Sequence, residues 1–381
     1  MVSVIDSALF LWLNPFTQWF YRSAAGRLTL RIVDLIFNIM LRLGTRAGFM
    51  FFTRLPTDYT SDRALVMAQE AVARGYTFEV LSVFGRFHDT FKITTLDKAP
   101  LIFSGVPRLD QVKAITAGWM DDKWLLKQRL LEQGIPVSRG RSVNSLAEAK
   151  RVFTTLTKPV IVKPRFGSRG RHTTTHIRTE ADLVRAYQSA RQLGIRVLVE
   201  EHLFGSVYRA TCINGKLAGV LAGDPPRITG DGSSTIAVLI DKKNAQRSQR
   251  VAAVTITDKH QAFLATLHYT LDTVLPDGQE IDLSEKIGLS YGGSSREVTT
   301  ATHPQLKEVL ERAAVAVDDP LLGFDFITPD VAADPGTVKW GIIECNSVPF
   351  INLHHDPLYG EPVNVAGILF DYLERELNWK K

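Results

Sequence analysis

Three oxygen-bearing side chains near the end of the chain have the types and spacing of a metal site. Glu344 and Asn346 stand two residues apart in the apolar run 341–349, so their side chains point to the same side of a strand. Asp325, in a second apolar run over 323–327, would complete the cluster from a neighbouring strand. Such oxygens suit Mg²⁺, which also binds nucleotide phosphates. The alternative is that Asp325 and Glu344 end two strands and face solvent.

A loop rich in glycine and arginine is a second candidate for phosphate binding. It follows a strand predicted over 159–163, and its backbone N–H groups and guanidinium forks could close over phosphates. It is not a P-loop, because the Gly-Lys-Ser/Thr ahead of a helix is missing, and an ordinary hairpin is the alternative. Its residues are Gly167, Ser168, Arg169, Gly170 and Arg171.

Periodicity and turn signals predict the elements that must position these residues. Asn214-Gly215, the strongest short turn signal in the chain, predicts a hairpin over 208–221. Helices are expected over 61–74, 119–134, 145–155 and 180–193. Strands are expected over 78–84, 100–103, 159–163 and 196–203.

The composition is that of a folded protein with a large core. With 381 residues and 45% hydrophobic residues, the chain can form two or three domains. A net charge of +5 and a pI near 9.1 suit acidic substrates and phosphates, and without interleaved aromatic and basic residues no nucleic-acid partner is expected. Cys212 and Cys345 lie in apolar runs, so no disulfide is expected and a reducing cytoplasm fits.

The first 48 residues form an amphipathic helical extension in this interpretation. They contain charges and no apolar run of about 18 residues, which argues against a spanning helix. The extension could be a helical hairpin buried against the body or a partner subunit, or a helix lying in the membrane plane. Arg31, Asp34, Asn38 and Arg42 form its polar stripe, and Trp12, Trp19 and Phe20 would lie at the headgroup level. Residues 49–118 are predicted to form a small α/β domain, which is either a lid or substrate-binding domain or a scaffold, and 119–381 the domain of the candidate site.

Further motifs follow one another in a characteristic order. They are Lys163-Pro164 with 167–171, Gly205, Tyr208-Arg209, 228–232 with 234–236, Gly292-Gly293, Val298-Thr299, His303-Pro304, 344–349 and His354. From Asp122 onward this order resembles the ATP-grasp ligases, and within them the ATP-grasp region of cyanophycin synthetase. The resemblance implies an α+β, ATP-grasp fold, in which two α/β subdomains grip ATP.

The resemblance also implies an activity and a nucleotide site. These enzymes phosphorylate a carboxylate with ATP and let an amine attack the acyl phosphate. Lys123 and Lys163 would reach the α- and β-phosphates, and the loop 167–171 would close over the triphosphate. The linker residues Glu200, Glu201 and Leu203 would present their backbone to the adenine edge.

Metal ions and transferred groups are assigned in the same way. Asp325, Glu344 and Asn346 would hold two Mg²⁺ ions, for which Mn²⁺ could substitute. Arg209 and Arg296 are candidates for steadying the phosphoryl group or the substrate carboxylate. For Arg296 a solvated surface position is the alternative.

The chain departs from the family pattern at three points. Val207 stands where an acidic residue usually meets the ribose, so Glu201 is a possible substitute. Asn352 stands where the cyanophycin enzymes usually have arginine. The sequence ends at Lys381 without their second, Mur-ligase-like domain, so one kind of ligation is expected.

The expected reaction joins an amino acid or peptide carboxylate to an amine, in a homo-oligomer. Five arginines exceed what ATP needs and favour an acidic substrate group: Arg165, Arg169, Arg171, Arg209 and Arg227. One alternative is a D-alanine-type dipeptide ligase or a glutathione-synthetase-like enzyme. Another is a non-catalytic nucleotide-binding sensor or scaffold, associated with the membrane through residues 1–48.

Overall fold

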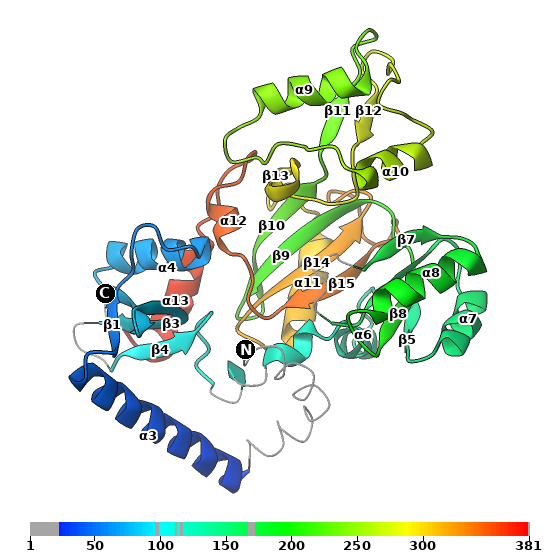
Figure 1. The fold of residues 1–381 in the computed structure, drawn as a ribbon. Helices are drawn as coiled ribbons and strands as arrows, with labels where there is room; N and C mark the ends of the chain where they lie inside the picture. Colours follow the sequence, from blue (N-terminus) through cyan, green and yellow to red (C-terminus); the bar gives the residue numbers. More distant parts are fainter. Residues whose placement is uncertain (1–22, 96–98, 111–112, 115–116, 167–171, 380–381) are drawn as a thin grey trace.

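The computed structural model describes residues 23–95, 99–110, 113–114, 117–166 and 172–379 (Figure 1). Within them the architecture is α+β, as predicted, with all named strand pairs antiparallel. The loop 167–171 and the aromatic residues Trp12, Trp19 and Phe20 lie outside the described residues.

The central sheet carries the candidate metal residues. Its order is β13 (Ser294–Glu297), β10 (Lys216–Asp224), β9 (Ser206–Ile213), β14 (Leu321–Thr328) and β15 (Gly341–Asn346). Asn214 and Gly215, at φ 48° and 75°, join β9 to β10 in the predicted hairpin. Helices α6 (Lys123–Glu132) and α11 (Pro304–Val317) share a hydrophobic core with one face of this sheet. The opposite face is therefore the one left for a site.

A smaller sheet stands beside the central one. Its order is β5 (Gly140–Val143), β8 (Val197–Glu201), β6 (Val160–Pro164) and β7 (Thr174–Ile177), and α7 (Leu146–Thr155) and α8 (Glu180–Arg191) pack on it. Ser145 and Thr179 cap these helices by accepting hydrogen bonds from the backbone N–H groups of Glu148 and Asp182. Residues of both sheets line one large open cleft, among them Ile161 and Thr175 on one side and Arg209 and Asp325 on the other.

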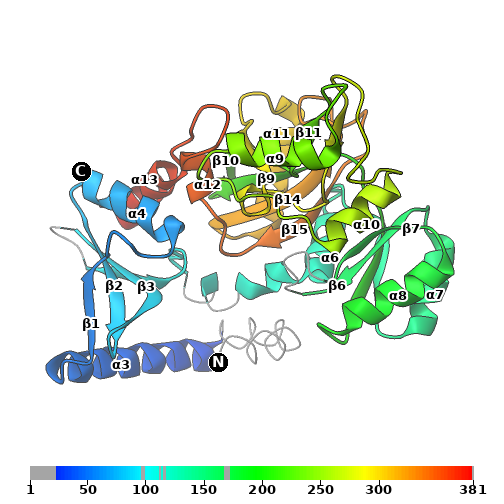
Figure 2. The ribbon, with the colours of Figure 1, turned by 45° about the horizontal axis from the view of Figure 1, so that its top comes forward.

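An N-terminal unit follows the helix α3 (Ala24–Arg46). It comprises α4 (Asp62–Ala73) and a sheet ordered β1 (Met50–Arg54), β2 (Thr77–Val83), β3 (Arg86–Thr94) and β4 (Leu101–Ser104). The last helix, α13 (Val365–Leu377), packs against α4 in the same hydrophobic core. The domain boundaries at residues 49 and 119 remain predictions. The helix α13 belongs by sequence to the last predicted domain, yet it packs in the core of the N-terminal unit. Figure 2 shows α3 running along the bottom of this unit.

A small subdomain rises above the central sheet (Figure 1). It comprises β11 (Arg227–Thr229), α9 (Ile236–Gln246), α10 (Asp258–Thr266) and β12 (Glu280–Asp282) around its own apolar core. The short helices η1 (Ala117–Asp121), η2 (Leu289–Tyr291) and α12 (Asn352–His355) complete the described elements. The four helices expected from periodicity are all present within a few residues, whereas β1 and β3 were not predicted.

Candidate functional site

The three candidate metal residues lie together at the cleft. Asp325 on β14 is directly opposite Glu344 on β15, and Gly323 is opposite Asn346. The amide nitrogen of Asn346 lies 3.4 Å from Asp325 Oδ2. Phe324 and Cys345, which alternate with them, are buried on the other face. The geometry has the arrangement that the spacing predicts, and the role of these residues as metal ligands remains a prediction.

Each of the two carboxylates meets a cation. Arg209 on β9 donates from Nε to Asp325 Oδ1 at 2.8 Å and from Nη2 to Oδ2 at 3.0 Å, and this carboxylate raises the pKa of Arg209. Lys123, the first residue of α6, lies with Nζ 3.1 Å from Glu344 Oε1. The two carboxylates thus lie side by side between two cations, Arg209 on β9 and Lys123 on α6, so the site has little net charge.

The second predicted lysine belongs to a buried cluster in the smaller sheet. Lys163 Nζ lies 3.0 Å from Glu200 Oε2, and Lys127 contacts the other oxygen of the same carboxylate. Ser138 donates to Glu200 Oε2 at 3.0 Å. Burial alone would raise the pKa of Glu200, but the two ammonium groups outweigh it and lower the pKa to about 2. Glu200 therefore stays ionised and fixes both lysines.

The N-terminus of α6 is tied to the end of β6 by a buried ion pair. Asp122 caps the helix through the N–H groups of Trp124 and Leu125. Its carboxylate also accepts from Arg165 Nε at 2.7 and 2.9 Å, and both residues are buried. This pair holds Lys123, which follows the cap, beside the last residues before the loop 167–171.

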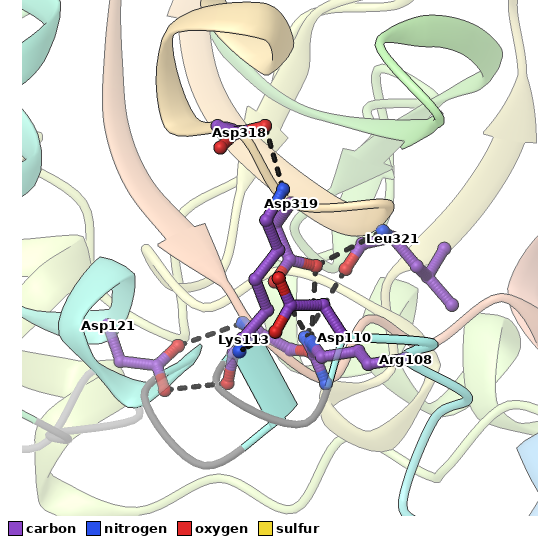
Figure 3. Close-up of polar contacts among 8 residues, drawn as sticks. Arg108, Asp110, Lys113, Asp121, Asp318, Asp319 and Leu321 are labelled. Carbon is purple, nitrogen blue, oxygen red and sulfur yellow. Dashed lines mark hydrogen bonds and ion pairs between the residues drawn. The ribbon is translucent and has the colours of Figure 1, made fainter. Parts of the chain in front are cut away.

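A polar network supports the turn that follows Asn346. Asp121 accepts hydrogen bonds from the backbone N–H of Ser347 at 2.9 Å and from its hydroxyl at 2.8 Å. Burial raises the pKa of Asp121, and these two bonds oppose the rise. Arg108 lies deeper, with Nε 2.9 Å from Asp319 Oδ2, and it also donates to the backbone oxygen of Ser347 (Figure 3). The start of β14 and the end of β15 therefore share one arginine.

A further buried group lies on the same face of the central sheet. His354 Nδ1 is 2.7 Å from Glu297 Oε2, and its Nε2 is 2.8 Å from Thr211 Oγ1. Register places Glu297 opposite Leu221, which is itself opposite Arg209. Glu297 is therefore in the same cross-strand row as Arg209 and Asp325, although it belongs to the sheet edge. His354 was noted in the sequence only as a family motif, and Glu297 was missed.

Two predicted site residues point elsewhere. Arg296 is opposite Ala222 and shares its face, away from Asp325, and its exposed guanidinium lies 5.6 Å from the centre of the Tyr359 ring. The carboxylate of Glu201 accepts from Arg139, Lys339 and the backbone of Thr157. Burial would raise the pKa of Glu201, yet these bonds lower it to about 2. Arg296 is therefore not placed at the metal residues, and the suggestion that the Glu201 side chain meets a ribose is not supported.

The arginines cited for an acidic substrate need a similar correction. Arg165 is held by Asp122, and Arg209 by Asp325. Arg227 pairs with Asp282 and Glu280 on the subdomain hairpin. Arg169 and Arg171 lie outside the described residues. The cleft lining does contain other cations, Arg250, Lys259 and Lys286.

Leu203 is the last of the predicted site residues, and four further residues of the site were not predicted. Leu203 is buried and ends the linker after β8, next to Gly341 of β15. Lys127, Asp121, Arg108 and Ser138 were not identified from the sequence. Of these, Lys127 had a usable signal, because it lies four residues after Lys123 on the same helix face. The others meet their partners only through the tertiary fold.

Comparison with known sequences agrees with the motifs. No protein-family model matches the chain. The cyanophycin synthetase of Synechocystis sp. is 31% identical over 261 residues, which cover 66% of this chain and 30% of that protein. The glutathione biosynthesis bifunctional protein of Clostridium perfringens is 26% identical over 317 residues, covering 81% of this chain and 40% of that protein. The chain thus spans less than half the length of these curated relatives.

A solved structure has the same fold. The crystal structure of a bifunctional glutathione synthetase from Pasteurella multocida superposes with a TM-score of 0.59 at 22% identity. The superposition covers 82% of this chain and 43% of that one. At this identity the likeness concerns the fold alone. The chain has the ATP-grasp fold, and over 66% of its length it is similar to part of cyanophycin synthetase, as its motifs predict.

Proposed function

We propose that the protein is an ATP-dependent ligase that joins a carboxylate to an amine. The carboxylate would attack the γ-phosphorus of ATP, giving an acyl phosphate and ADP, and the amine would then displace phosphate and lose a proton. One observation carries the proposal: on one face of the cleft, Asp325 and Glu344 are each paired with a cation, Arg209 or Lys123. Such cations can turn to phosphate oxygens once the carboxylates take other partners.

The donor set fits Mg²⁺. Asp325, Glu344 and Asn346 offer two carboxylates and an amide oxygen from adjacent strands, which is oxygen chemistry of the kind Mg²⁺ prefers. Within the described residues no three His, Cys, Asp or Glu side chains form a group that could hold a metal ion, and the proposed set instead includes the amide of Asn346. Two Mg²⁺ ions, or Mn²⁺ in their place, are proposed. When bound, they would neutralise the negative charge of the triphosphate.

The chain's own residues would bind and orient the nucleotide. The ammonium groups of Lys123 and Lys163, now held by Glu344 and Glu200, are proposed to reach the phosphates. Both lysines are buried, so their charges act in a medium of low dielectric constant. Arg209 has the planar fork that suits a phosphoryl group or a substrate carboxylate. The backbone from Glu200 to Leu203 is proposed to face the adenine.

The proposed substrates are amino acids or small peptides, one of them with an acidic group. Because Arg165, Arg209 and Arg227 are paired with carboxylates, the acidic group is instead proposed from three other cations that line the cleft. These are Arg250, Lys259 and Lys286. Arg250 pairs with Asp356, which lines the same cleft, and Lys286 lies 4.6 Å from the centre of the Tyr291 ring. Both cations are at the surface and able to exchange partners with a substrate carboxylate.

A second candidate is a ligase of the glutathione-synthetase kind. The similarity to the Clostridium perfringens protein covers 81% of this chain, more than the 66% covered by the cyanophycin synthetases. It therefore extends beyond the ATP-grasp region defined by the motifs. This candidate predicts that a γ-glutamyl dipeptide and glycine would be joined.

The test is phosphate release from ATP and Mg²⁺ with a panel of amino acids and peptides. The panel contains acidic, basic and neutral amino acids, D-alanine, and a γ-glutamyl dipeptide with glycine, and each product is identified by mass. Glu344→Gln should abolish release, whereas Glu311→Gln, at a surface carboxylate paired with Lys216, should retain it. ATP binding without release for any panel member would instead favour a nucleotide-binding protein that does not ligate.

The predicted homo-oligomer is part of the proposal. Light scattering on the purified protein gives its mass directly, and a mass of one chain at all concentrations tested would contradict it.

A further inference from the structure

The helix α3 has a wide apolar face that the described residues leave exposed. Leucine and isoleucine side chains along it are 47–59% accessible. At about 100° per residue, they fall within roughly 100° of the helix circumference. The residues are Leu28, Ile32, Leu35, Ile36, Ile39 and Leu43. An apolar stripe of this length marks an interaction surface.

The helix is held by a different side and by one end. Gly44 is buried, and a Cβ there would lie 2.5 Å from Met50 Cβ, so the helix touches β1 closely at this point. Thr45 donates from its hydroxyl to the backbone oxygen of Met50 at 2.8 Å. From this contact α3 extends away from the N-terminal sheet (Figure 1). The exposed stripe therefore belongs to an anchored helix with a fixed direction.

The charges on α3 point to a negatively charged occupant. Its sequence has four arginines, Arg27, Arg31, Arg42 and Arg46, and a single acidic residue, Asp34. On the helix circumference Arg31 and Arg42 border the apolar stripe directly. None of the described helices is long and apolar enough to cross a bilayer. Apolar side chains beside arginines suit a helix that lies in the interface of an anionic bilayer.

An exposed aromatic residue lies near the C-terminal end of α3. Phe84 is 75% accessible at the tip of the β2–β3 turn, and its ring stacks on Phe49 with 4.7 Å between the centroids. Its φ of 49° is unusual for a bulky residue, and glycine or asparagine is the common choice there. Phe49 lies in the connection from α3 to β1. The stacked pair therefore lies at the end where α3 is anchored, and the exposed stripe of α3 remains the docking candidate.

We infer that the apolar stripe of α3, with its bordering arginines, is a docking surface for an anionic lipid bilayer. This inference goes beyond the proposed ligation and does not depend on it. A second copy of this chain could cover the apolar stripe too, but a copy would bring the same arginine-rich border and little compensating acid. The bilayer is therefore the favoured occupant, and the second copy is an outcome of the test.

The test is co-sedimentation of the full chain with lipid vesicles. Vesicles of phosphatidylcholine with about one third phosphatidylglycerol should bind the protein at least about tenfold more strongly than pure phosphatidylcholine. Raising the salt concentration should weaken that binding. No sedimentation with the anionic vesicles, or equal sedimentation with both, would overturn the inference.

Variants distinguish vesicle binding through the apolar stripe from nonspecific hydrophobic binding. Leu35→Glu/Ile39→Glu, and separately Arg31→Gln/Arg42→Gln, should each lower vesicle binding by about tenfold or more. The matched control, Val72→Glu/Val315→Glu, changes two apolar residues that are 66% and 67% exposed on other helices, and it should bind as the wild type does. If Leu35→Glu/Ile39→Glu binds vesicles as strongly as the control variant does, the inference is overturned. A wild-type dimer that this variant converts to monomer without any vesicle binding would also overturn it, because a second copy would then be the occupant.

Discussion

Arg209 and Asp325 face each other across adjacent strands, and both oxygens of the carboxylate accept hydrogen bonds from the guanidinium. A metal ion at Asp325 would have to share this carboxylate with Arg209 or displace it. If the metal ion displaced it from Asp325, the Arg209 guanidinium would be free to bind a negatively charged phosphate group. The pair links the proposed metal site to the proposed phosphoryl site.

Arg209→Ala should lower kcat for phosphate release by about 100-fold, because a donor to developing charge in a desolvated site contributes on the order of 3 kcal/mol. Arg209→Lys keeps the charge but not the fork, so a loss of about tenfold is expected. The control is Arg227→Ala, which removes a paired arginine on the subdomain hairpin and should change kcat by less than about twofold. Unchanged kcat in a folded Arg209→Ala variant would exclude the proposed role.

Glu200 should make the stability of the fold fall at acid pH. Its pKa is lowered to about 2 in the folded state, below that of an unfolded-chain glutamate near 4.3. Its contribution is therefore complete above about pH 4.3 and is lost as the pH falls toward 2. Urea unfolding at several pH values measures this loss for the wild type.

Glu200→Gln is the matched comparison for that measurement. At pH 7 it should lower the free energy of unfolding by about 3 kcal/mol, because Lys127 and Lys163 lose their buried counter-charge. The difference from the wild type should narrow between pH 4.3 and 2. A difference that stays constant over this range would show that the carboxylate does not titrate as inferred.

Local patterns in the sequence were enough to predict which of the proposed metal residues share a strand face. Strand alternation predicts that Glu344 and Asn346 share a face, and the structure has them so. Arg209 and Asp325 are 116 residues apart, and their hydrogen bonds depend on the pairing of β9 with β14. That pairing is a tertiary fact, so the partner of either residue was not readable from the sequence.

Arg296 and Glu297 illustrate a second limit. Neighbouring residues on a strand point to opposite faces, and a shift of one residue in register exchanges them. The register of β13 is set by its pairing with β10, where Ala222 meets Arg296. The sequence favoured the arginine because its chemistry suits phosphate, yet the strand turns Glu297 to that face. The same holds for Glu200 and Glu201: Glu200 pairs with the buried Lys127 and Lys163, whereas Glu201 pairs with Arg139 and Lys339.

Asp121 should act as a positioning residue for Asn346. It holds the backbone and hydroxyl of Ser347, the next residue, so Asp121→Ala should raise the Mg²⁺ concentration for half-maximal phosphate release by about tenfold. Asp121→Asn keeps one acceptor and should recover most of the wild-type Mg²⁺ dependence. Equal loss of kcat in both variants without any change in Mg²⁺ dependence would point to a purely structural role.

Neither cysteine should be needed for the reaction. Burial raises the pKa of Cys345 and of Cys212 well above the usual range, so both remain thiols and are poor nucleophiles. Cys345→Ser should keep kcat within about an order of magnitude of the wild type in the phosphate-release assay, in line with a direct attack of the carboxylate on ATP. Complete loss in a folded variant would require a different chemistry.

Arg108 and Asp319 form a buried ion pair that joins the segment before the central domain to the start of β14 (Figure 3). Arg108→Met leaves the Asp319 carboxylate buried without its partner, and the backbone oxygen of Ser347 without a donor. The free energy of unfolding should fall by about 3 to 5 kcal/mol. Urea denaturation measures it.

The double variant Arg108→Met/Asp319→Leu removes both charges at once. It should be more stable than Arg108→Met alone, because an unpaired buried charge costs more than an apolar pair of similar volume. Lys113→Met, which breaks a surface pair with Asp318, should change the stability by less than about 1 kcal/mol. A double variant no more stable than Arg108→Met would show that the two buried charges are not coupled.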